Sequence, residues 1–547
     1  MQFRSSVPPV PVMSPELYSL TGERQRSLWQ STADTLSLPA LAGDASTDVC
    51  IIGAGIAGLS VAYELTLAGR PVIVLDHSPI GAGMTGRTSA HLSNALDDRY
   101  EKLERVLGAD DARLAAESHT GAIDRIAVIA ATEHIPCAFE RVDGYLFAPP
   151  GDESGYLSRE YQAACRAGLR VEWVPRAPFP AFETGDALRF PEQGQFHPLR
   201  YLTGLADAIQ RRGGRIFTGT HVDSMEGGRG AIAVTARGVV SARHLVIATN
   251  TPVNNRFILH TKQAPYTTCM VGLRFPAGAL PHALFWDTRQ SADQDGDAYH
   301  YVRTWRDRDG DVLLVGGEDH KTGQHPGIEG SFAALEAWAR LRFPNGGEVG
   351  WRWTGQVFEP VDGMAFIGRN PHDADNVYIV TGDSGNGLTH GVIAGLLLSS
   401  LITGKPHPWA GLYDPRRITV RTAPAFLQEN LNVAAQYRDH LTGGDWESTD
   451  AIPPGSGGIV REGLHKLAVF RDDDGQIHCC SAVCPHLKCI VHWNSVERTW
   501  DCPCHGSRFD AFGKVLTGPA IRDLALVEEP PEVPLNPIPV SAVLVPP

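Results

Sequence analysis

The chain has 547 residues, of which 43% are hydrophobic and 20% charged, a composition typical of a globular protein with about three or four domain-sized units. Its 48 Lys and Arg against 62 Asp and Glu give a formal charge of −14, which excludes nucleic acid as the main partner because phosphate binding needs a basic face. No apolar run reaches the roughly 18 residues of a membrane helix, and the N-terminus has no apolar core of signal-peptide length, so we expect a cytoplasmic protein without a membrane span.

The expected elements divide the chain into four parts. Residues 1–46 are rich in Pro and Ser and predict an extension with one short helix near residues 27–35. Strand-like and helix-like segments then alternate over residues 47–425, a linker follows over 426–457, and short strands and turns over 458–547 predict an all-β unit. In the second part we expect strands over 48–52, 71–76, 215–222 and 244–249, helices over 55–68, 100–135 and 201–211, a largely antiparallel sheet over 256–354, and a glycine-rich segment followed by an apolar helix over 355–403.

A glycine motif opens the first expected helix. Gly53, Gly55 and Gly58 follow a buried strand in the order G-x-G-x-x-G. The first glycine makes the tight turn, the second lets the backbone approach a pyrophosphate, and the third lets helix pack on strand. Asp76 ends the next strand, 18 residues past Gly58, where a carboxylate accepts hydrogen bonds from ribose hydroxyls. The strand, helix, second strand and acid together predict a dinucleotide site.

Four further segments carry a family resemblance, and they read G-A-G-M-T-G-R-T-S-A-H-L (81–92), L-V-I-A-T-N-T-P (245–252), V-D-G-M-A-F-I-G (361–368) and T-G-D-S-G-N-G-L-T-H-G (381–391). Together with the glycine motif they resemble the FAD-dependent oxidoreductase superfamily typified by D-amino-acid oxidase. The resemblance implies an α/β Rossmann-type FAD-binding domain, assembled from residues 47–98, 195–255 and 355–425. It also implies an interposed substrate domain with a mixed or antiparallel sheet, from residues 99–194 and 256–354.

The same resemblance implies which residues bind FAD. The last glycine segment would lie over the flavin ring, where backbone N–H groups stabilise negative charge on the reduced flavin. A strand residue, Val222, would contact adenine through its backbone. The FAD-binding candidates are Gly53, Gly55, Ile56, Ala57, Gly58, Asp76, His77, Arg87, Thr88, Val222, Thr249, Gly385, Asn386, Gly387, Leu388 and Thr389.

One position departs from some relatives. Where they attach FAD covalently through a His in a G-S-x-W-H-type turn, this chain reads G-M-T-G-R, with Arg87 in place of the histidine. We therefore predict non-covalent FAD, and His91 is the alternative attachment residue.

The cysteines are unevenly distributed, since six of the ten lie between Cys479 and Cys504, and this crowding predicts a metal site in one small C-terminal unit. Cys484 and His486 form a C-x-H pair, and Cys502 and His505 form a C-x-x-H pair. Two Cys on one iron and two His on the other is the Rieske [2Fe–2S] arrangement. A structural zinc site is the alternative, but a Cys₂His₂ finger needs C-x-x-C and H-x-x-x-H pairs.

The two remaining cysteines of these motifs, Cys489 and Cys504, resemble the second pair of Rieske proteins of the cytochrome bc type, which implies a disulfide between the cluster loops. Ser507 matches a residue whose hydroxyl bonds a bridging sulfide in high-potential members, whereas Phe509 stands where those members carry Tyr. One donor to sulfur is kept and one is lost, so we predict an intermediate reduction potential. G-P-A (518–520) resembles the proline loop that covers the cluster.

Substrate residues are not fixed by any motif. A substrate carboxylate needs a cation, for which Arg303, Arg274 and Arg352 are candidates. Pocket candidates in the interposed sheet are Tyr301, Trp286 and His320. His320, His325 and Asp319 also have the residue types of a mononuclear iron site, but the flavin body already accounts for this segment, and a turn after a strand is the preferred interpretation.

The whole pattern resembles bacterial proteins that fuse a D-amino-acid-oxidase-type flavoprotein to a C-terminal Rieske domain. This implies oxidation of a small amine or amino acid at FAD, with electrons leaving one at a time through the cluster's exposed His edge to an external one-electron acceptor. A flavin takes two electrons and a Rieske cluster carries one, which gives the fusion a physical purpose. Alternatives are oxygen as the acceptor with an idle cluster, an NAD(P)H-dependent reductase feeding an oxygenase, and a non-catalytic carrier. The reductase would be expected to show a second G-x-G-x-x-G directly after a strand for the nicotinamide cofactor, and we find none in that position, since the glycines of 81–86 belong to the flavin resemblance.

Overall fold

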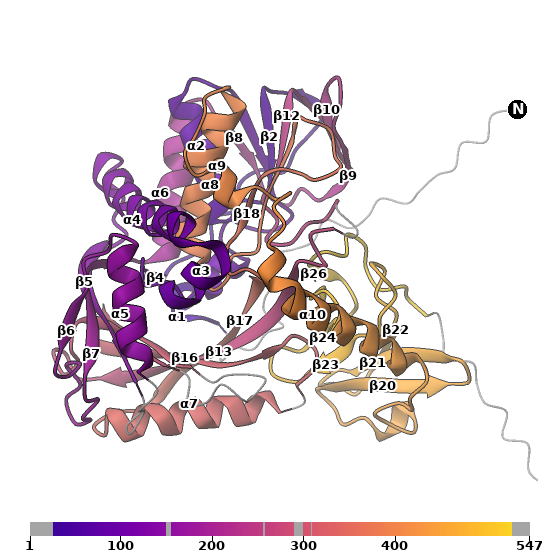
Figure 1. Ribbon diagram of the computed structural model, residues 1–547. Helices are drawn as coiled ribbons and strands as arrows, with labels where there is room; N and C mark the ends of the chain where they lie inside the picture. The colour runs from indigo at the N-terminus through magenta and orange to yellow at the C-terminus, as the bar shows by residue number, and fades with distance from the viewer. Residues whose placement is uncertain are drawn as a thin grey trace, which may run out of the picture.

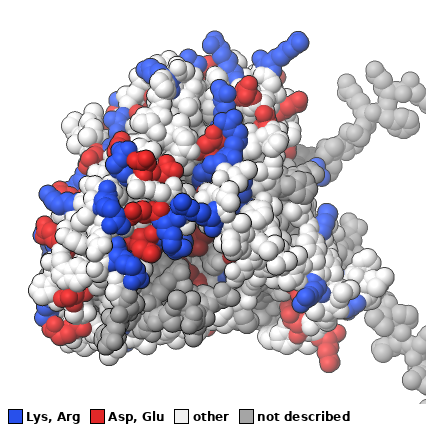
Figure 2. Space-filling view, in the orientation of Figure 1, with Lys and Arg blue, Asp and Glu red and all other residues white. Residues whose placement is uncertain are grey.

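The structure is a computed structural model that describes residues 26–148, 155–254, 258–288, 299–307, 309–325 and 327–527. Parts of the expected extension (1–25) and of the expected C-terminal unit (528–547) lie outside the described residues. Figure 1 shows three regions: a parallel sheet with helices at the top, a large sheet below it, and a small β unit to the lower right. None of the described helices is long and apolar enough to cross a membrane. On the face in Figure 2, basic and acidic side chains are interspersed.

The first region is built on a six-stranded sheet whose strands are parallel apart from the edge pair β18–β19. Every residue of β2 (Val49–Ile52) is buried, as expected for a strand covered on both faces. In order across the sheet the strands are β18 (Phe366–Arg369), β19 (Val377–Thr381), β12 (His244–Ile247), β2, β3 (Val72–Leu75) and β8 (Arg215–Phe217). A four-stranded sheet of β1 (Ala45–Ser46), β11 (Gly238–Ala242), β10 (Ala231–Thr235) and β9 (Val222–Glu226) lies beside it.

Helices α2 (Ile56–Leu67) and α8 (Gly387–Ile402) cross closely in this region. Two glycines of α8 permit the contact, since a Cβ on Gly391 would come within 2.8 Å of Ile56 Cγ2 and one on Gly395 within 2.9 Å of the Ser60 backbone. The close crossing brings the N-termini of both helices to one side of the sheet. The other helices of this part are α1 (Leu28–Thr32), η3 (Met84–Arg87), α3 (Tyr100–Leu107), α4 (Ala109–Thr132), α5 (Tyr156–Arg166), α6 (Pro198–Arg211), α9 (Ala410–Tyr413) and η4 (Val420–Thr422).

The second region is a nine-stranded, mostly antiparallel sheet with α7 (Ile328–Arg342) packed on it. Its strands are β17 (Val349–Pro360), β13 (Gln263–Phe275), β16 (Gly310–Lys321), β15 (Tyr301–Asp307), β14 (Ala283–Asp287), β5 (Glu140–Phe147), β7 (Ala187–Gln195) and β4 (His91–Leu92), with β6 (Glu172–Val174) beside β7. Strand β17 is an edge, so one side of its backbone is free to bond with other parts of the chain.

The third region holds two small antiparallel sheets, drawn in yellow and light orange in Figure 1. Their strands are β20 (Ser456–Glu462), β21 (His465–Arg471) and β22 (Ile477–Ser481) in one sheet, and β23 (His492–Asn494), β24 (Thr499–Asp501), β25 (Arg508–Asp510) and β26 (Val515–Thr517) in the other. The predicted α/β body with an interposed sheet and an all-β C-terminal unit is therefore confirmed.

The segment expected to be a linker contains helix α10 (Ala423–Gln436), followed by η5 (Tyr437–His440) and η6 (Thr449–Ala451). Helix α10 is bound on one side to the large sheet, where Glu429 pairs with Lys321 at 2.6 Å. Its C-terminal end reaches the third region, where the Tyr437 hydroxyl donates to the Leu487 carbonyl at 2.6 Å and a His440 ring nitrogen lies 2.8 Å from the Lys488 carbonyl. The connection is thus a packed helix that contacts both domains (Figure 1).

Candidate functional site

The glycine motif forms a cradle that only glycine fits. Gly53 has φ +107°, and a Cβ there would lie 2.3 Å from the Ala248 carbonyl oxygen. A Cβ on Gly58 would lie 1.9 Å from the Gly53 carbonyl oxygen, so helix α2 starts directly against the end of β2. Because these glycines carry no side chain, a pyrophosphate can approach the backbone at the helix N-terminus, which fits a dinucleotide.

The acidic residue of the motif is held at the same edge. Both oxygens of Asp76 accept backbone hydrogen bonds, from Ala54 at 2.6 Å and from Ser78 at 2.8 Å. These bonds fix the carboxylate beside the glycine turn, where the ribose of a dinucleotide is expected. His77 follows it, half-exposed, with its ring 6.1 Å from that of His221, the residue before Val222 at the start of β9.

Two polar side chains next to the cradle lack partners. Asn250 and Thr251 follow β12, and the Asn250 side-chain nitrogen and the Thr251 hydroxyl are buried without a hydrogen bond among the described residues. Asn250 also has φ +68°, which turns the chain sharply after Thr249. Buried polar groups are normally paired, so these atoms point to a bound polar group. Together with the cradle they show that the chain's residues fit FAD.

The last glycine segment brings Gly385 to the start of α8, with φ +73°. A Cβ on Gly385 would lie 2.0 Å from an Asp97 carboxylate oxygen, so Asp97 touches this turn. Thr389, in the first turn of α8, has its hydroxyl 2.8 Å from His119 Nδ1 and donates to the Asn386 carbonyl at 3.0 Å. The FAD-binding candidates of residues 385–389 thus lie together at one helix N-terminus, and their contacts with FAD stay a prediction.

The side chain of Arg87 extends from the flavin body to the C-terminal unit. Its guanidinium pairs with Glu497 of the C-terminal unit and donates from Nε to the Thr354 carbonyl at 3.2 Å. His91, the alternative covalent residue, has both ring nitrogens close to protein oxygens, at 2.9 Å from the Ser89 hydroxyl and 3.1 Å from the Val302 carbonyl. Neither side chain offers a free nucleophile for a covalent flavin bond, which supports the prediction of non-covalent FAD.

The four proposed cluster ligands lie in two like pairs. The Cys484 and Cys502 sulfurs are within hydrogen-bonding distance of each other, and the His486 and His505 ring centroids are 5.1 Å apart. Backbone N–H groups lie near each sulfur, those of His486 and Leu487 near Cys484 and those of Cys504 and His505 near Cys502. His505 Nδ1 is buried with no hydrogen-bond partner among the described residues. Two sulfurs on one side and two imidazoles on the other fit a Rieske cluster rather than one tetrahedral zinc.

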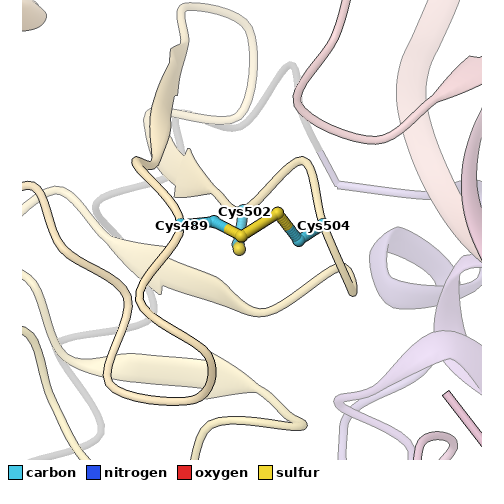
Figure 3. Close-up of side chains that lie close together, drawn as sticks. All are labelled: Cys489, Cys502 and Cys504. Atoms are coloured by element: carbon cyan, nitrogen blue, oxygen red, sulfur yellow. A yellow bond between two sulfur atoms is a disulfide. The ribbon is translucent and has the colours of Figure 1, made fainter. Parts of the chain in front are cut away.

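The structure joins Cys489 and Cys504 in a disulfide, the pairing that the resemblance implied. Figure 3 shows the Cys502 sulfur beside this bond, which ties together the two loops that carry the ligands. Ser507 contacts Cys484 and accepts a hydrogen bond from Ala520 N–H at 3.0 Å, which places residues 518–520 over the cluster site. Phe509 is fully buried. Its ring supplies no donor to sulfur.

The histidine edge is only partly exposed. His505 is 6% exposed, His486 is half-buried, and the ring of His260 from the flavin body lies 4.8 Å from that of His486 and 5.4 Å from that of His505. The sequence pattern did not reveal this because the edge is covered by a segment more than two hundred residues away in the chain. In this structure the flavin body packs against the edge and buries His505, and His486 keeps part of its surface exposed.

Two further side chains connect the flavin turn to the cluster unit. Gln356 on edge strand β17 donates its backbone N–H to Met84 Sδ of η3 at 3.1 Å and its side-chain amide to the Gly506 carbonyl at 2.9 Å. Gly506 directly follows the ligand His505, and a Cβ there would lie 2.6 Å from Gln356 Nε2. Gln356 thus connects the expected flavin site to the cluster loop at Gly506, and Arg87 connects it to Glu497 of the C-terminal unit. Gln356 lies in a segment, W-T-G-Q-V-F-E-P-V-D-G, that resembles the family, but the segment gave no sign of this contact.

The arginine candidates do not face a substrate site. Arg303 is fully buried, and its guanidinium donates to Gln195 Oε1 at 3.1 Å, to the Ala90 carbonyl at 2.6 Å and to the Phe196 carbonyl at 3.0 Å. It also stacks on Trp29 at 4.8 Å. These bonds occupy all three nitrogens, so Arg303 has a structural role and the prediction of a carboxylate ligand is corrected.

The other arginine candidates are peripheral. Arg274 is exposed and stacks on Trp351 at 4.5 Å, and Arg352 pairs with Glu336 at 2.9 Å. His320 lies at the end of β16 with its ring 4.6 Å from His325. Among the described residues, His320, His325 and Asp319 do not form a group of converging metal ligands, so the iron-site alternative has no support.

The pocket candidates Tyr301 and Trp286 lie near one another around His91, at ring distances of 5.8 and 5.7 Å from it. Trp286 is buried against the sheet, whereas the Tyr301 hydroxyl lies 2.6 Å from that of Thr268. The sequence analysis missed Asp97, which lies beside Tyr299, the ring neighbour of Tyr301. Burial raises the pKa of Asp97 to about 6, against the opposing charge of Arg99.

Asp383 is a second half-buried acid near the same turn. Burial raises its pKa to about 6, although it accepts a hydrogen bond from Phe358 N–H at 3.1 Å. Asp97 contributes to this shift by its like charge. Asp383 lies inside the last glycine segment, so its position was visible in the sequence, but its proximity to Asp97 was not.

Comparison with known proteins agrees with both sites. The family model "FAD dependent oxidoreductase" matches residues 48–401, and the model "Rieske [2Fe-2S] domain" matches residues 447–530. A Bacillus subtilis protein named as a Rieske 2Fe-2S iron–sulfur protein, YhfW, is 31% identical over 512 residues, covering 92% of this chain and 98% of its own. Gamma-glutamylputrescine oxidoreductase of Escherichia coli is 27% identical over 367 residues, covering 65% of this chain and 84% of its own.

A solved structure supports the fold of the flavin body. Glycine oxidase from Geobacillus kaustophilus superposes with a TM-score of 0.56 at 18% identity, covering 68% of this chain and 100% of that one. The glycine cradle, the paired Cys and His ligands and the two family matches lead to the same assignment. The chain belongs to the FAD-dependent oxidoreductase family typified by D-amino-acid oxidase and carries a C-terminal Rieske [2Fe–2S] domain.

Proposed function

We propose that this protein oxidises a small amine at FAD and passes the electrons, through its Rieske cluster, to an external one-electron acceptor. Oxidation of R₂CH–NH₂ to R₂C=NH releases two protons and two electrons, and each electron reduces one molecule of the acceptor. When bound, FAD supplies the two-electron oxidation and the cluster supplies the one-electron transfer. The observation that carries the proposal is the packing of the cluster loops on the flavin body through Gln356 and Arg87.

The acidic surroundings of the expected flavin favour an amine over an α-amino acid. None of the arginine candidates is placed to bind a carboxylate, whereas Asp97 touches Gly385 at the start of α8. With a pKa of about 6, Asp97 is ionised at neutral pH and attracts a substrate ammonium group. Tyr299 and Tyr301 form the adjoining wall. The relative that acts on gamma-glutamylputrescine by its name is consistent with such a substrate.

The residue roles follow the two sites described above. We assign FAD binding to the glycine cradle, Asp76, the loop after β12 and residues 385–389, and cluster ligation to Cys484, His486, Cys502 and His505. The division into a flavin body (47–425), a connecting segment (426–457) and a cluster domain (458–547) is part of this proposal. Water exclusion at the cluster is provided by residues 518–520 and by the flavin body itself.

An anaerobic visible spectrum tests the function. The purified protein is mixed separately with a panel of amines, a panel of amino acids, NADH and NADPH, and both the flavin and the cluster absorbance are followed. We expect the amines to bleach both chromophores and the nicotinamides to bleach neither. Bleaching by NADH or NADPH alone would make the protein a reductase and overturn the proposal.

A variant isolates the role of the cluster. In Cys484→Ser, turnover with oxygen and with an artificial one-electron acceptor is compared with that of the unchanged protein. We expect flavin reduction by the amine to persist and turnover with the one-electron acceptor to collapse. Equal turnover with that acceptor in both proteins would show that the cluster is idle.

A further inference from the structure

The histidine edge of the cluster site is in contact with a third histidine. His260 is 4% exposed and lies in the turn that leads into β13. Its ring, that of His486 and that of His505 form a triangle with centroid distances of 4.8, 5.4 and 5.1 Å. These distances are those of packed rings. A residue of the flavin body therefore covers both proposed imidazole ligands of the cluster.

The turn that carries His260 is anchored on two sides. From α10, the Asn430 side chain donates to the Thr261 carbonyl at 3.0 Å. From the flavin body, Lys262 Nζ donates to the carbonyls of Pro415 at 3.1 Å and Arg417 at 2.8 Å. The turn that carries His260 is thus held by the fold on either side of it.

The placement matters because the imidazole ligands are the outward side of a Rieske cluster, while the cysteine side lies within the domain. Here Cys484 and Cys502 are buried among the apolar residues of the C-terminal unit, together with the disulfide. The imidazole side is the side that His260 of the flavin body contacts. The rate of electron transfer falls steeply with distance and with intervening water. A ring packed against both ligands would therefore shorten the path between flavin and cluster and exclude water from it.

We propose that His260 is the contact through which the flavin body meets the Rieske cluster: it positions the histidine edge, keeps water from it and completes the internal path for electrons. The inference rests on the proposed function, since it requires electrons to pass from FAD to the cluster. Each passage moves one electron, which would oxidise reduced flavin by one equivalent and reduce the cluster by one. The N–H proton of the reduced flavin would be released to solvent when the second electron leaves. The second electron follows once the external acceptor has taken the first.

The first experiment measures the internal transfer without any substrate. Protein loaded with both cofactors is kept anaerobic in the presence of EDTA. A light flash photoreduces the flavin, and cluster reduction is then followed by absorbance. We expect His260→Ala to lower the first-order rate constant for cluster reduction at least tenfold. His260→Phe, which keeps a ring in the contact, should stay within about threefold of the unchanged protein.

Gln324→Ala is the matched control, because Gln324 donates to the Pro503 carbonyl at 3.0 Å across the same interface without touching either imidazole. Its rate should stay within twofold. A rate in His260→Ala equal to that of Gln324→Ala would overturn the inference, and so would a His260→Phe rate as low as that of His260→Ala.

The second experiment reports on water at the edge and does not depend on the flavin. The cluster is reduced with dithionite after exchange into D₂O, and deuterium close to it is measured by electron spin-echo modulation. We expect a deeper deuterium modulation in His260→Ala than in the unchanged protein and in His260→Phe. Equal depths in all three would overturn the role of His260.

The two experiments separate the inference from the proposed function. If the unchanged protein shows no cluster reduction after flavin photoreduction, the proposed function fails, and the deuterium measurement still decides whether His260 covers the edge. The content of flavin and the spectrum of the reduced cluster in each variant show that both sites are assembled.

Discussion

The buried ion pair between the two domains gives a prediction with a definite magnitude. Arg87 is 11% and Glu497 2% exposed at the side chain, and Glu497 also accepts from Thr354, at 3.1 Å from its N–H and 2.8 Å from its hydroxyl. Removing one partner of a buried pair costs about 3–5 kcal/mol, because the other charge stays buried and unpaired. Glu497→Gln keeps an oxygen for the Thr354 N–H, so we expect a loss of stability at the low end of this range, about 3 kcal/mol.

The Thr354 amide is a direct probe of this interface. It belongs to edge strand β17 and donates to Glu497, so its hydrogen exchange requires the cluster domain to leave the edge. Since about 1.4 kcal/mol changes an equilibrium constant tenfold, 3 kcal/mol predicts roughly hundredfold faster exchange in Glu497→Gln. Fragment-resolved mass spectrometry measures it. The Phe358 amide on the same strand, which donates to Asp383, is the internal reference and should stay protected.

A matched surface variant sharpens the test. Arg498 and Asp473 form an exposed pair at 3.0 Å in the same domain, and exposed pairs contribute about 0–1 kcal/mol. Asp473→Asn should therefore change Thr354 exchange less than about fivefold. If Glu497→Gln exchanges no faster than Asp473→Asn, the buried pair does not hold the domains together and the reasoning is refuted.

The remaining predictions concern the two cofactors, the substrate site and pH. Cys484→Ser should abolish the electron paramagnetic resonance signal of the reduced cluster and leave the flavin spectrum unchanged; a surviving Rieske signal would contradict the ligand assignment. Phe509→Tyr should raise the reduction potential of the cluster by adding a donor to sulfur, as measured by redox titration, and an unchanged or lower value would refute this. Acid precipitation should leave the protein pellet colourless, since FAD is predicted to be non-covalent. Asp97→Asn should lower kcat/KM for an amine about 10- to 100-fold, because a charged hydrogen bond is lost. In the unchanged protein, affinity for the amine should fall as the pH drops through about 6 and Asp97 becomes neutral, and the variant should not show this fall. A pH profile that is the same in both proteins would exclude Asp97 from substrate binding. Burial would raise the pKa of Glu497, but the charges of Arg87 and Arg508 hold the pKa below its ordinary value. The interface should therefore be stable above about pH 4.3 and weaken as the pH falls below that value. Thr354 exchange, corrected for its intrinsic rate, should show this weakening in the unchanged protein and not in Glu497→Gln.

The parts that could be predicted from the sequence are those in which local spacing carries the chemistry. Gly53, Gly58 and Asp76 lie within one βαβ unit, whose strands and helix confine them to one edge. Cys484 and His486 are likewise two residues apart on one loop. For such groups the order of residue types alone limits the possible geometry, so the fold class and both cofactor sites were accessible.

The parts that could not be predicted depend on packing between distant segments. Arg303 has the residue type of a carboxylate ligand, but only the tertiary structure shows that carbonyls surround its guanidinium. Glu497 and Arg87 are 410 residues apart in the chain, and His260 meets His486 across the same interface. No pattern in either segment indicates the other. The contact of His260 with the histidine edge, and the burial of His505, were missed for this reason.

The connecting helix α10 has a consequence for how partners find the cluster. A loose tether would let the cluster domain travel between the flavin and an outside protein, and the pace of that shuttle would depend on tether length and solvent viscosity. Here Glu429 fastens the helix to one domain and Tyr437 to the other, so the cluster stays with the flavin. Under the proposed function, the acceptor would have to come to a stationary donor, and selectivity among acceptors would depend on the shape of the outer surface of the cluster domain and not on the reach of a moving arm.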